Sequence, residues 1–317
     1  MVNVLITGGC GFVGTNLIDY LLLNTDWKIN VLDNLSAGKL EYLTCIDNYD
    51  KDRIDFYKGD IRNEKDISLS LEGCDHVIHL AAQTDVISSI DSPLEDAEIN
   101  IIGTIKLLQA AVKKEVKRLT LASSAAPLGE QDMPIHEEKV PEPMSPYGAS
   151  KLSCEGYCSA FAESYGLKTV ALRFSNVYGP YSWHKGSVIA KFIKQIIDGE
   201  KPVIYGDGDQ TRDFIHTKDI SQALHMSTIK DLPRDYELFQ VATGEETSVN
   251  ELYEYISRKM DKMGYDISEP EYGKERSGEI YRNYADITKA KDKLGYNPKI
   301  KLEEGLEETI AWFLENY

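Results

Sequence analysis

Apolar and polar residues follow two regular patterns along the first half of the chain. Short apolar runs are typical of buried strands, and longer stretches with apolar positions three and four residues apart are typical of amphipathic helices. The runs predict strands at residues 2–7, 28–33, 54–58, 76–80, 118–122 and 168–173. The stretches between them predict helices at residues 13–23, 64–71, 94–114 and 146–165.

This regular succession of strands and helices predicts an α/β fold. Strand-helix-strand connections are right-handed almost without exception, so we expect helices on both faces of a doubly wound parallel sheet of Rossmann type. After Arg173, turn sequences interrupt the alternation of strands and helices. We therefore predict a Rossmann domain at residues 1–175 and a smaller, mixed substrate-binding lobe at residues 176–317, with residues 214–243 able to return to the main sheet.

The charge balance narrows the classes of partner. The chain has 52 acidic and 35 basic residues, a formal net charge of -17, which repels nucleic acids and anionic membrane surfaces. The first residues enter a strand pattern without a basic leader, and no apolar stretch approaches the length of a membrane span. We expect a cytoplasmic protein without nucleic-acid or membrane partners.

Five cysteines, an odd number without framework spacing, indicate reduced thiols. Cys154 and Cys158 lie one helical turn apart and could be metal ligands, but no further Cys or His is close to them in sequence. Packing in a helix is the favoured interpretation, and we expect no metal site.

A glycine-rich segment directly follows the first predicted strand and opens the first predicted helix. Glycine at Gly8, Gly11 and Gly14 would let the backbone turn tightly and approach a diphosphate, which would meet the helix N-terminus at Phe12 and Val13. Asp33 ends the next strand, where a carboxylate binds a ribose and repels a 2′-phosphate. We therefore predict NAD as the cofactor, with further contacts from Asn34, Asp60, Ile61, Leu80, Ala81 and Ala82. A glycine-rich turn without a ligand is the alternative.

Tyr147 and Lys151 are four residues apart, so they share one face of the predicted helix. An ammonium beside a phenol favours the phenolate, and a tyrosine whose pKa is lowered in this way could act as a general base. With 19 tyrosines in the chain, such a pair could also arise by chance. The hydroxyl of Ser124, predicted at the ligand-binding edge of the sheet, strengthens the catalytic interpretation.

Five segments together resemble the extended short-chain dehydrogenase/reductases, and among them the nucleotide-sugar epimerases of the UDP-glucose 4-epimerase type. The resemblance covers nearly the whole chain. It rests on residues 7–14, on Ser123-Ser124-Ala125-Ala126, on Tyr147 with Lys151, on Asn176-Val177-Tyr178-Gly179-Pro180, and on Arg212-Asp213-Phe214-Ile215-His216.

The resemblance implies a role for each matching residue. Tyr147 would take a proton from the sugar O4 with help from Ser124, while a hydride passes to NAD and a transient 4-keto sugar forms. Lys151 would bind the nicotinamide ribose and lower the pKa of Tyr147. The implied substrate-binding residues are Thr84, Ser124, Asn176, the diphosphate-binding Arg212 and Arg276, and Asn283 at the position that sets the size of the sugar pocket. For both arginines, a solvated surface position is the alternative.

Some positions depart from the family pattern. The sugar dehydratases and decarboxylating relatives carry an acid after the catalytic hydroxyl residue, where this chain has Ala125 and Ala126, so elimination is disfavoured. Pro127-Leu128 replaces the usual Val-Tyr and could alter the loop over the sugar. His184 and Lys185 could contact a substrate carboxylate, although a plain surface loop is the favoured interpretation. His79 is expected in the core.

The predicted function is therefore an NAD-dependent UDP-sugar 4-epimerase, acting on UDP-glucose, UDP-N-acetylglucosamine or UDP-glucuronate. A dehydratase, decarboxylase or reductase of the same family is the alternative, and a dinucleotide-sensing scaffold without activity is a third. The family also implies a homodimer that pairs the helices predicted at residues 94–114 and 146–165.

Overall fold

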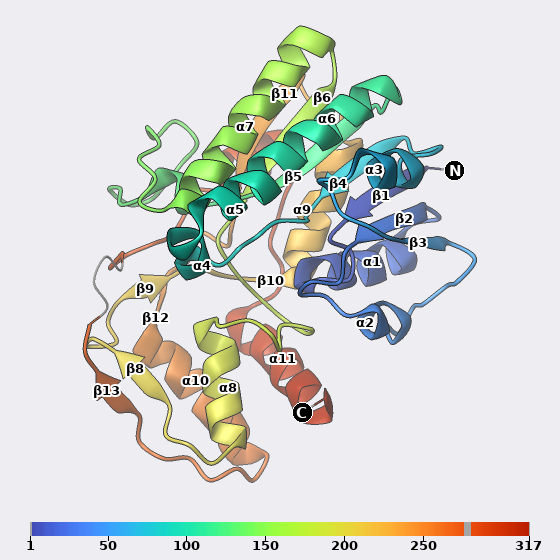
Figure 1. The fold of residues 1–317 in the computed structure, drawn as a ribbon. Coiled ribbons are helices and arrows are strands. Elements are labelled where there is room, and N and C mark those ends of the chain that lie inside the picture. Colours follow the sequence, from blue (N-terminus) through green and yellow to red (C-terminus); the bar gives the residue numbers. More distant parts are fainter. Residues whose placement is uncertain (1, 276–279, 317) are drawn as a thin grey trace.

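The structure, a computed structural model, describes residues 2–275 and 280–316. Within them, seven parallel strands form one sheet in the order β11-β6-β5-β4-β1-β2-β3 (Figure 1). Their bounds are β1 Asn3–Thr7, β2 Lys28–Asp33, β3 Ile54–Lys58, β4 His76–His79, β5 Arg118–Ser124, β6 Lys168–Phe174 and β11 Tyr236–Val241. The predicted doubly wound α/β fold is confirmed, with β5 and β6 extending beyond their predicted ends.

Two hydrophobic clusters cover the two faces of this sheet, because successive residues of a strand point to opposite sides. Val4 and Ile6 of β1 face one cluster with α1 and α9, whereas Leu5 faces the other with α3, α6 and α7. Cys154 and Cys158 are buried in this second cluster. The helix bounds are α1 Phe12–Asn24, α2 Leu40–Thr44, α3 Glu64–Ser70, α6 Gly103–Lys113, α7 Pro146–Tyr165 and α9 Thr217–Ile229.

The helix predicted at residues 94–114 is a composite run. After α4 (Val86–Asp91), it begins as α5 (Pro93–Ala97), continues as a π-helical turn (Glu98–Ile102) and ends as α6. The side chain of Asn100 in this turn accepts a hydrogen bond from the Gln83 N–H at 2.9 Å and donates one to the Gln83 carbonyl at 3.0 Å. The wide turn therefore holds the loop that follows β4.

The remaining elements form a second lobe below the sheet in Figure 1. Helices α8 (Val188–Ile197), α10 (Val249–Lys262) and α11 (Leu302–Asn316) surround a third hydrophobic cluster. Short strand pairs border it: β7 (Asn176–Tyr178) with β10 (Phe214–His216), β8 (Val203–Tyr205) with β13 (Glu271–Gly273), and β9 (Thr211–Arg212) with β12 (Thr247–Ser248). Between these pieces, α9 packs on α1 and β11 forms an edge of the main sheet. The domain boundary at residue 175 stays a prediction.

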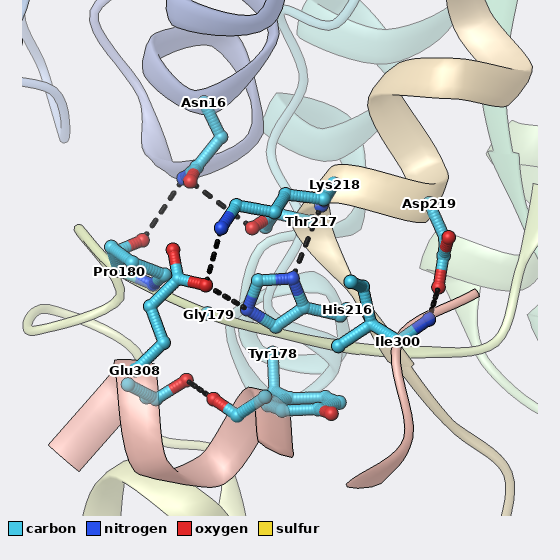
Figure 2. Close-up of polar contacts among 12 residues, drawn as sticks. Asn16, Tyr178, Gly179, Pro180, His216, Thr217, Lys218, Asp219, Ile300 and Glu308 are labelled. Atoms are coloured by element: carbon cyan, nitrogen blue, oxygen red, sulfur yellow. Dashed lines mark hydrogen bonds and ion pairs between the residues drawn. The ribbon is translucent and has the colours of Figure 1, made fainter. Parts of the chain in front are cut away.

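Polar side chains join the two lobes (Figure 2). Asn16 on α1 donates hydrogen bonds to the carbonyls of Phe12 and Pro180, at 2.8 and 3.0 Å, and accepts one from Thr217 at 3.0 Å. Lys218 forms an ion pair with Glu308 of α11. The Asn16 contacts fix the chain after β7 against the first helix, and the ion pair ties α9 to α11. Among the described residues, no helix has the length and apolar character needed to cross a bilayer.

A buried ion pair fixes α7 on the sheet. The guanidinium of Arg173 on β6 binds the carboxylate of Glu155 on α7 through two hydrogen bonds, of 2.9 and 2.7 Å, and the Ser123 hydroxyl donates a third at 2.5 Å. The exposed fractions are 2% for Arg173 and 3% for Glu155. Because each charge depends on the other inside the protein, loss of one partner leaves a buried charge uncompensated.

We therefore expect Glu155→Gln to lower the free energy of unfolding by about 3 kcal/mol, because it leaves the Arg173 charge without its counterion. Urea denaturation followed by circular dichroism measures the change. The matched control is Glu163→Gln, which removes an exposed carboxylate from the same helix and should change stability by less than about 0.5 kcal/mol. Equal, small effects of the two variants would show that the pair does not hold α7.

Candidate active site

A cavity of about 930 Å³ lies at the carboxyl edge of the parallel sheet. Loops that follow β1, β2, β3 and β4 supply most of its wall, as expected where parallel strands end together. Of the predicted cofactor residues, Tyr147 and Lys151 are not in this wall, whereas the others line it together with Thr84: Gly8, Gly11, Phe12, Val13, Gly14, Asp33, Asn34, Asp60, Ile61, Leu80, Ala81 and Ala82. Their role in binding NAD stays a prediction, which the local geometry supports.

The glycines of this wall have steric reasons to be glycine. A Cβ atom on Gly8, which has a φ of +71°, would lie 2.8 Å from the Ala81 nitrogen, and one on Gly14 would lie 2.3 Å from the Gly8 oxygen. Gly11, the N-cap residue of α1, has no side chain to bind the amides of the first turn. Those N–H groups lack partners within the helix, so the loop fits a diphosphate.

Asp33 ends β2 at the cavity wall. One carboxylate oxygen accepts a hydrogen bond from the Cys10 N–H at 2.9 Å, and the other accepts one from the Leu35 N–H at 2.8 Å. Burial raises the pKa of Asp33, and the two backbone hydrogen bonds oppose this shift. Each oxygen can accept a further bond, so the side chain fits the ribose hydroxyls of NAD.

Asp60 lies at the cavity edge near the end of β3. Its carboxylate accepts hydrogen bonds from the Arg62 guanidinium at 2.9 and 2.8 Å and from the Asn34 amide at 3.0 Å. Chiefly through the Arg62 contact, the pKa of Asp60 is held well below its usual range. The protein therefore orders this carboxylate itself, and its contact with an adenine ring stays a prediction.

The three predicted catalytic side chains lie together. Ser124 ends β5, and its hydroxyl is hydrogen-bonded to the phenol of Tyr147 in the first turn of α7. Lys151, one turn later, has its ammonium 6.0 Å from the centre of the Tyr147 ring and donates to the Ala122 carbonyl at 2.9 Å. The helix starts here because the Ser145 hydroxyl accepts the Gly148 N–H at 3.1 Å and Pro146 occupies the first turn.

One electrostatic expectation for this group was wrong. Burial raises the pKa of Tyr147 to about 12, and only the hydrogen bond with Ser124 lowers it, so the expected lowering by Lys151 is not found. Burial also lowers the pKa of Lys151 itself. Both side chains lie inside the protein. There, the cost of removing a charge from water exceeds the stabilisation that the ammonium would give to a phenolate.

The predicted substrate residues of the second lobe form a separate group around Asp213. The Asn176 amide donates to the Asp213 carbonyl at 3.4 Å, the Asp213 N–H donates to the Asn283 carbonyl at 2.9 Å, and Arg212 donates to the Thr211 carbonyl at 2.8 Å. None of the three predicted residues is in the wall of the cavity described above, and Arg276 lies outside the described residues. Their contacts with substrate stay predictions.

Asp213 anchors the segment that contains Arg212. Its buried carboxylate accepts hydrogen bonds from the Thr243 N–H and hydroxyl, at 2.9 and 2.7 Å, and from the Gly244 N–H at 2.9 Å. The loop that follows β11 is therefore tied to the strand pair β7-β10. This carboxylate has a structural role that the motif alone does not distinguish from a catalytic one.

Several wall residues were not predicted. Ser36, Ala37 and Gly38 follow β2 directly, and the rule that ligands bind at strand ends would have found them. A Cβ atom on Gly38 would lie 2.4 Å from the Cys10 oxygen. Lys185, for which the sequence left a carboxylate contact and a plain surface loop open, lies in this wall on the loop that follows β7, and its ammonium donates to the Thr84 hydroxyl at 3.1 Å.

His79 is a core residue, as expected. Hydrogen bonds join its two ring nitrogens to the hydroxyls of Thr7 and Thr104, at 2.7 and 3.0 Å. Burial lowers the pKa of His79 to about 3, so the ring is neutral at physiological pH. With both nitrogens engaged, it has no free site for proton transfer.

The chain is similar to known proteins along nearly its whole length. Residues 5–309 match the family model described as GDP-mannose 4,6 dehydratase. A putative UDP-glucose 4-epimerase of Methanocaldococcus jannaschii is 37% identical over 318 residues, which cover 99% of each chain.

Solved structures resemble the whole chain. The UDP-N-acetylglucosamine 4-epimerase from Methanobrevibacter ruminantium M1, in complex with UDP-N-acetylmuramic acid, is 39% identical, with a TM-score of 0.91 and coverage of 100% of this chain and 99% of that one. The UDP-glucose 4-epimerase of Thermus thermophilus, in complex with NAD, is 31% identical, with a TM-score of 0.86 and coverage of 99% of each chain. The chain therefore belongs to the extended short-chain dehydrogenase/reductase family, in its group of nucleotide-sugar epimerases and dehydratases.

Proposed function

We propose that the protein is an NAD-dependent UDP-sugar 4-epimerase, which inverts carbon 4 of a hexose through a transient 4-keto sugar. The observation that carries the proposal is the meeting of Ser124, Tyr147 and Lys151 at the sheet edge that also bears the glycine-lined cavity. The similarity to UDP-sugar 4-epimerases along the full chain supports it. UDP-glucose, UDP-N-acetylglucosamine and UDP-glucuronate are the candidate substrates.

NAD is the cofactor, and the residues present fit it. The first-turn amides of α1 would hold its diphosphate, Asp33 would bind the adenosine ribose and Lys151 the nicotinamide ribose. When bound, NAD supplies a positively charged ring that favours a nearby phenolate and accepts a hydride from the sugar. The chain itself supplies binding, orientation and proton transfer.

Proton transfer falls to Tyr147. With a pKa of about 12 set by burial, its phenol stays protonated at neutral pH as long as only the chain's own groups surround it. The Ser124 hydroxyl can bridge the phenol and the sugar O4, which gives the proton a short path in both directions. Lys151 contributes a buried positive charge one turn away. The same phenol would return the proton after the hydride reaches the opposite face of the sugar.

The residues after Ser124 favour epimerisation over elimination. Ala125 and Ala126 offer no acid that could help to expel water from the sugar. The Ala126 N–H is instead hydrogen-bonded to the Ser124 hydroxyl oxygen at 3.1 Å, and Pro127 and Leu128 are buried in a short 3₁₀ turn. This segment therefore orients Ser124 and adds no second catalytic group.

We expect the purified protein to convert at least one of UDP-glucose, UDP-N-acetylglucosamine and UDP-glucuronate to its C4 epimer without added reductant. Nuclear magnetic resonance or chromatography of the products measures the conversion. A stable 4-keto product, release of CO2 or consumption of NADPH would instead identify a dehydratase, decarboxylase or reductase. If all three substrates stay unchanged while NAD is bound, the proposed function is wrong.

Tyr147→Phe should reduce kcat by about 10²- to 10⁴-fold, because it removes the group that transfers the proton. NAD content, measured by absorbance after denaturation, should stay unchanged. Tyr49→Phe is the control, since Tyr49 lies outside the catalytic group with 41% of its surface exposed. A Tyr147→Phe protein with full turnover would exclude this residue as the base.

We also propose that the protein forms a homodimer through the helices on one face of the sheet. The composite run of α5 and α6 lies beside α7 there (Figure 1). Large apolar side chains are exposed along these helices, among them Leu94 (81% exposed), Ile102, Tyr157 and Tyr165. Exposed apolar surface of this kind is typical of an interaction site.

Size-exclusion chromatography with light scattering should therefore give the mass of a dimer at micromolar concentration. Leu94→Glu should shift it to a monomer, because the variant would bury a charge in the interface. Leu69→Glu, on α3 with 64% of its surface exposed, should leave the dimer intact. A wild-type monomer would contradict this assignment.

A further inference from the structure

The loop at residues 179–187 reaches the cavity from the second lobe, and several contacts hold it in place. The Asn16 amide on α1 donates to the Pro180 carbonyl at 3.0 Å (Figure 2). The Ser182 hydroxyl donates to the Gly179 carbonyl at 2.7 Å, and the Lys194 ammonium donates to the Trp183 carbonyl at 3.0 Å. The loop is therefore tied to both the cofactor helix α1 and α8.

Lys185 is the residue of this loop that contacts the part of the cavity wall that follows β4. Its ammonium donates to the hydroxyl of Thr84, which follows β4, at 3.1 Å. Among the described wall residues, it is the one lysine or arginine. The ionisable groups around it in the wall are mainly acids: Asp33, Asp60, Asp85, Asp91, Glu95 and Asp96.

The positive charge of Lys185 has incomplete compensation from the protein. An ammonium carries three N–H donors, and within the described residues only Thr84 accepts one. No described carboxylate lies within ion-pair distance of Lys185; Asp85, which acts on it at longer range, uses its carboxylate to cap α4 through the N–H and hydroxyl of Ser88. Burial and the charge of Lys151 lower the pKa of Lys185, whereas Asp85 raises it.

These contacts place a partly buried cation in the cavity wall, beside the Thr84 hydroxyl. A carboxylate on the sugar would supply both a counter-charge and acceptors for the remaining N–H donors, in charge-assisted hydrogen bonds. A neutral hydroxyl at the same place would leave the charge uncompensated. A site of this kind discriminates between substrates, because a substrate without the matching group leaves polar groups of the protein unpaired.

We propose that Lys185 and Thr84 recognise a carboxylate on the sugar, so that the enzyme prefers an acidic nucleotide sugar over its neutral counterpart. This inference rests on the proposed function. The carboxylate could be carbon 6 of a hexuronate or the lactyl ether of an N-acetylated amino sugar. Both present the same planar anion to the ammonium.

Two matched pairs of ligands separate these sources on the NAD-loaded protein. UDP-glucuronate differs from UDP-glucose only at carbon 6, and UDP-N-acetylmuramate differs from UDP-N-acetylglucosamine only by its lactyl group. Dissociation constants from calorimetry and kcat/KM values for epimerisation are measured for all four. We expect the wild-type protein to prefer the acidic member of one pair, and that pair identifies the source of the carboxylate.

Lys185→Gln should lower the acidic-over-neutral preference in that pair by about 10- to 100-fold, the range expected for a lost hydrogen bond to a charged group. Lys185→Arg should keep most of the preference, because it keeps the charge. Lys201→Gln, which removes an exposed lysine of the same lobe, should leave the preference unchanged. NAD content and the unfolding midpoint of each variant show that its fold is intact.

Three outcomes would overturn the inference. The first is a wild-type protein that binds the neutral members as tightly as the acidic ones. The second is a Lys185→Gln protein that keeps the preference, and the third is an equal loss for both members, which would indicate a contact with the diphosphate. Failure of the proposed function is separate: a Lys185-dependent preference in binding, without turnover of any ligand, would exclude the epimerase and retain the carboxylate site.

Discussion

The parallel direction of the strands is the constraint on which the rest of the molecule depends. Because β1, β4 and β5 all run the same way, the residues that follow them reach one edge of the sheet. The N-termini of α1 and α7 arrive at that edge as well. Gly8, Ala81 and Ser124 reach this edge although they are far apart in the chain, so the glycine loop lies at the same edge as the residues proposed to transfer the proton.

Burial governs the electrostatics of this edge. It raises the pKa of Tyr147 and lowers the pKa values of Lys151 and Lys185, so each group is driven toward its neutral form. A bound ligand of opposite charge would stabilise the charged form of such a group strongly, since water no longer competes for the interaction. The protonation states of the site therefore depend on the bound ligands as well as on the protein's own charges.

Hydrogen bonds from side chains to backbone carbonyls and amides hold the loops of the second lobe in place. Asn16 binds the carbonyl of Pro180, and the carboxylate of Asp213 gathers the amides of Thr243 and Gly244. These side chains do not contact one another. Each instead fixes a loop that carries other residues of interest, so the positions of Lys185 and Arg212 depend on groups with no chemical role of their own.

Local patterns in the sequence predicted six strands of the main sheet, the starts of the long helices and the shared face of Tyr147 and Lys151, because these features follow the period of one strand or one helical turn. The glycine turn was predicted from its place between a strand and a helix, whereas the short strands of the second lobe were not predicted. Only the tertiary structure decided which loops meet. The contact between Lys185 and Thr84 joins residues 101 positions apart, and the high pKa of Tyr147 follows from the atoms packed around it. Neither leaves a periodic signal, since burial is a property of the folded chain as a whole.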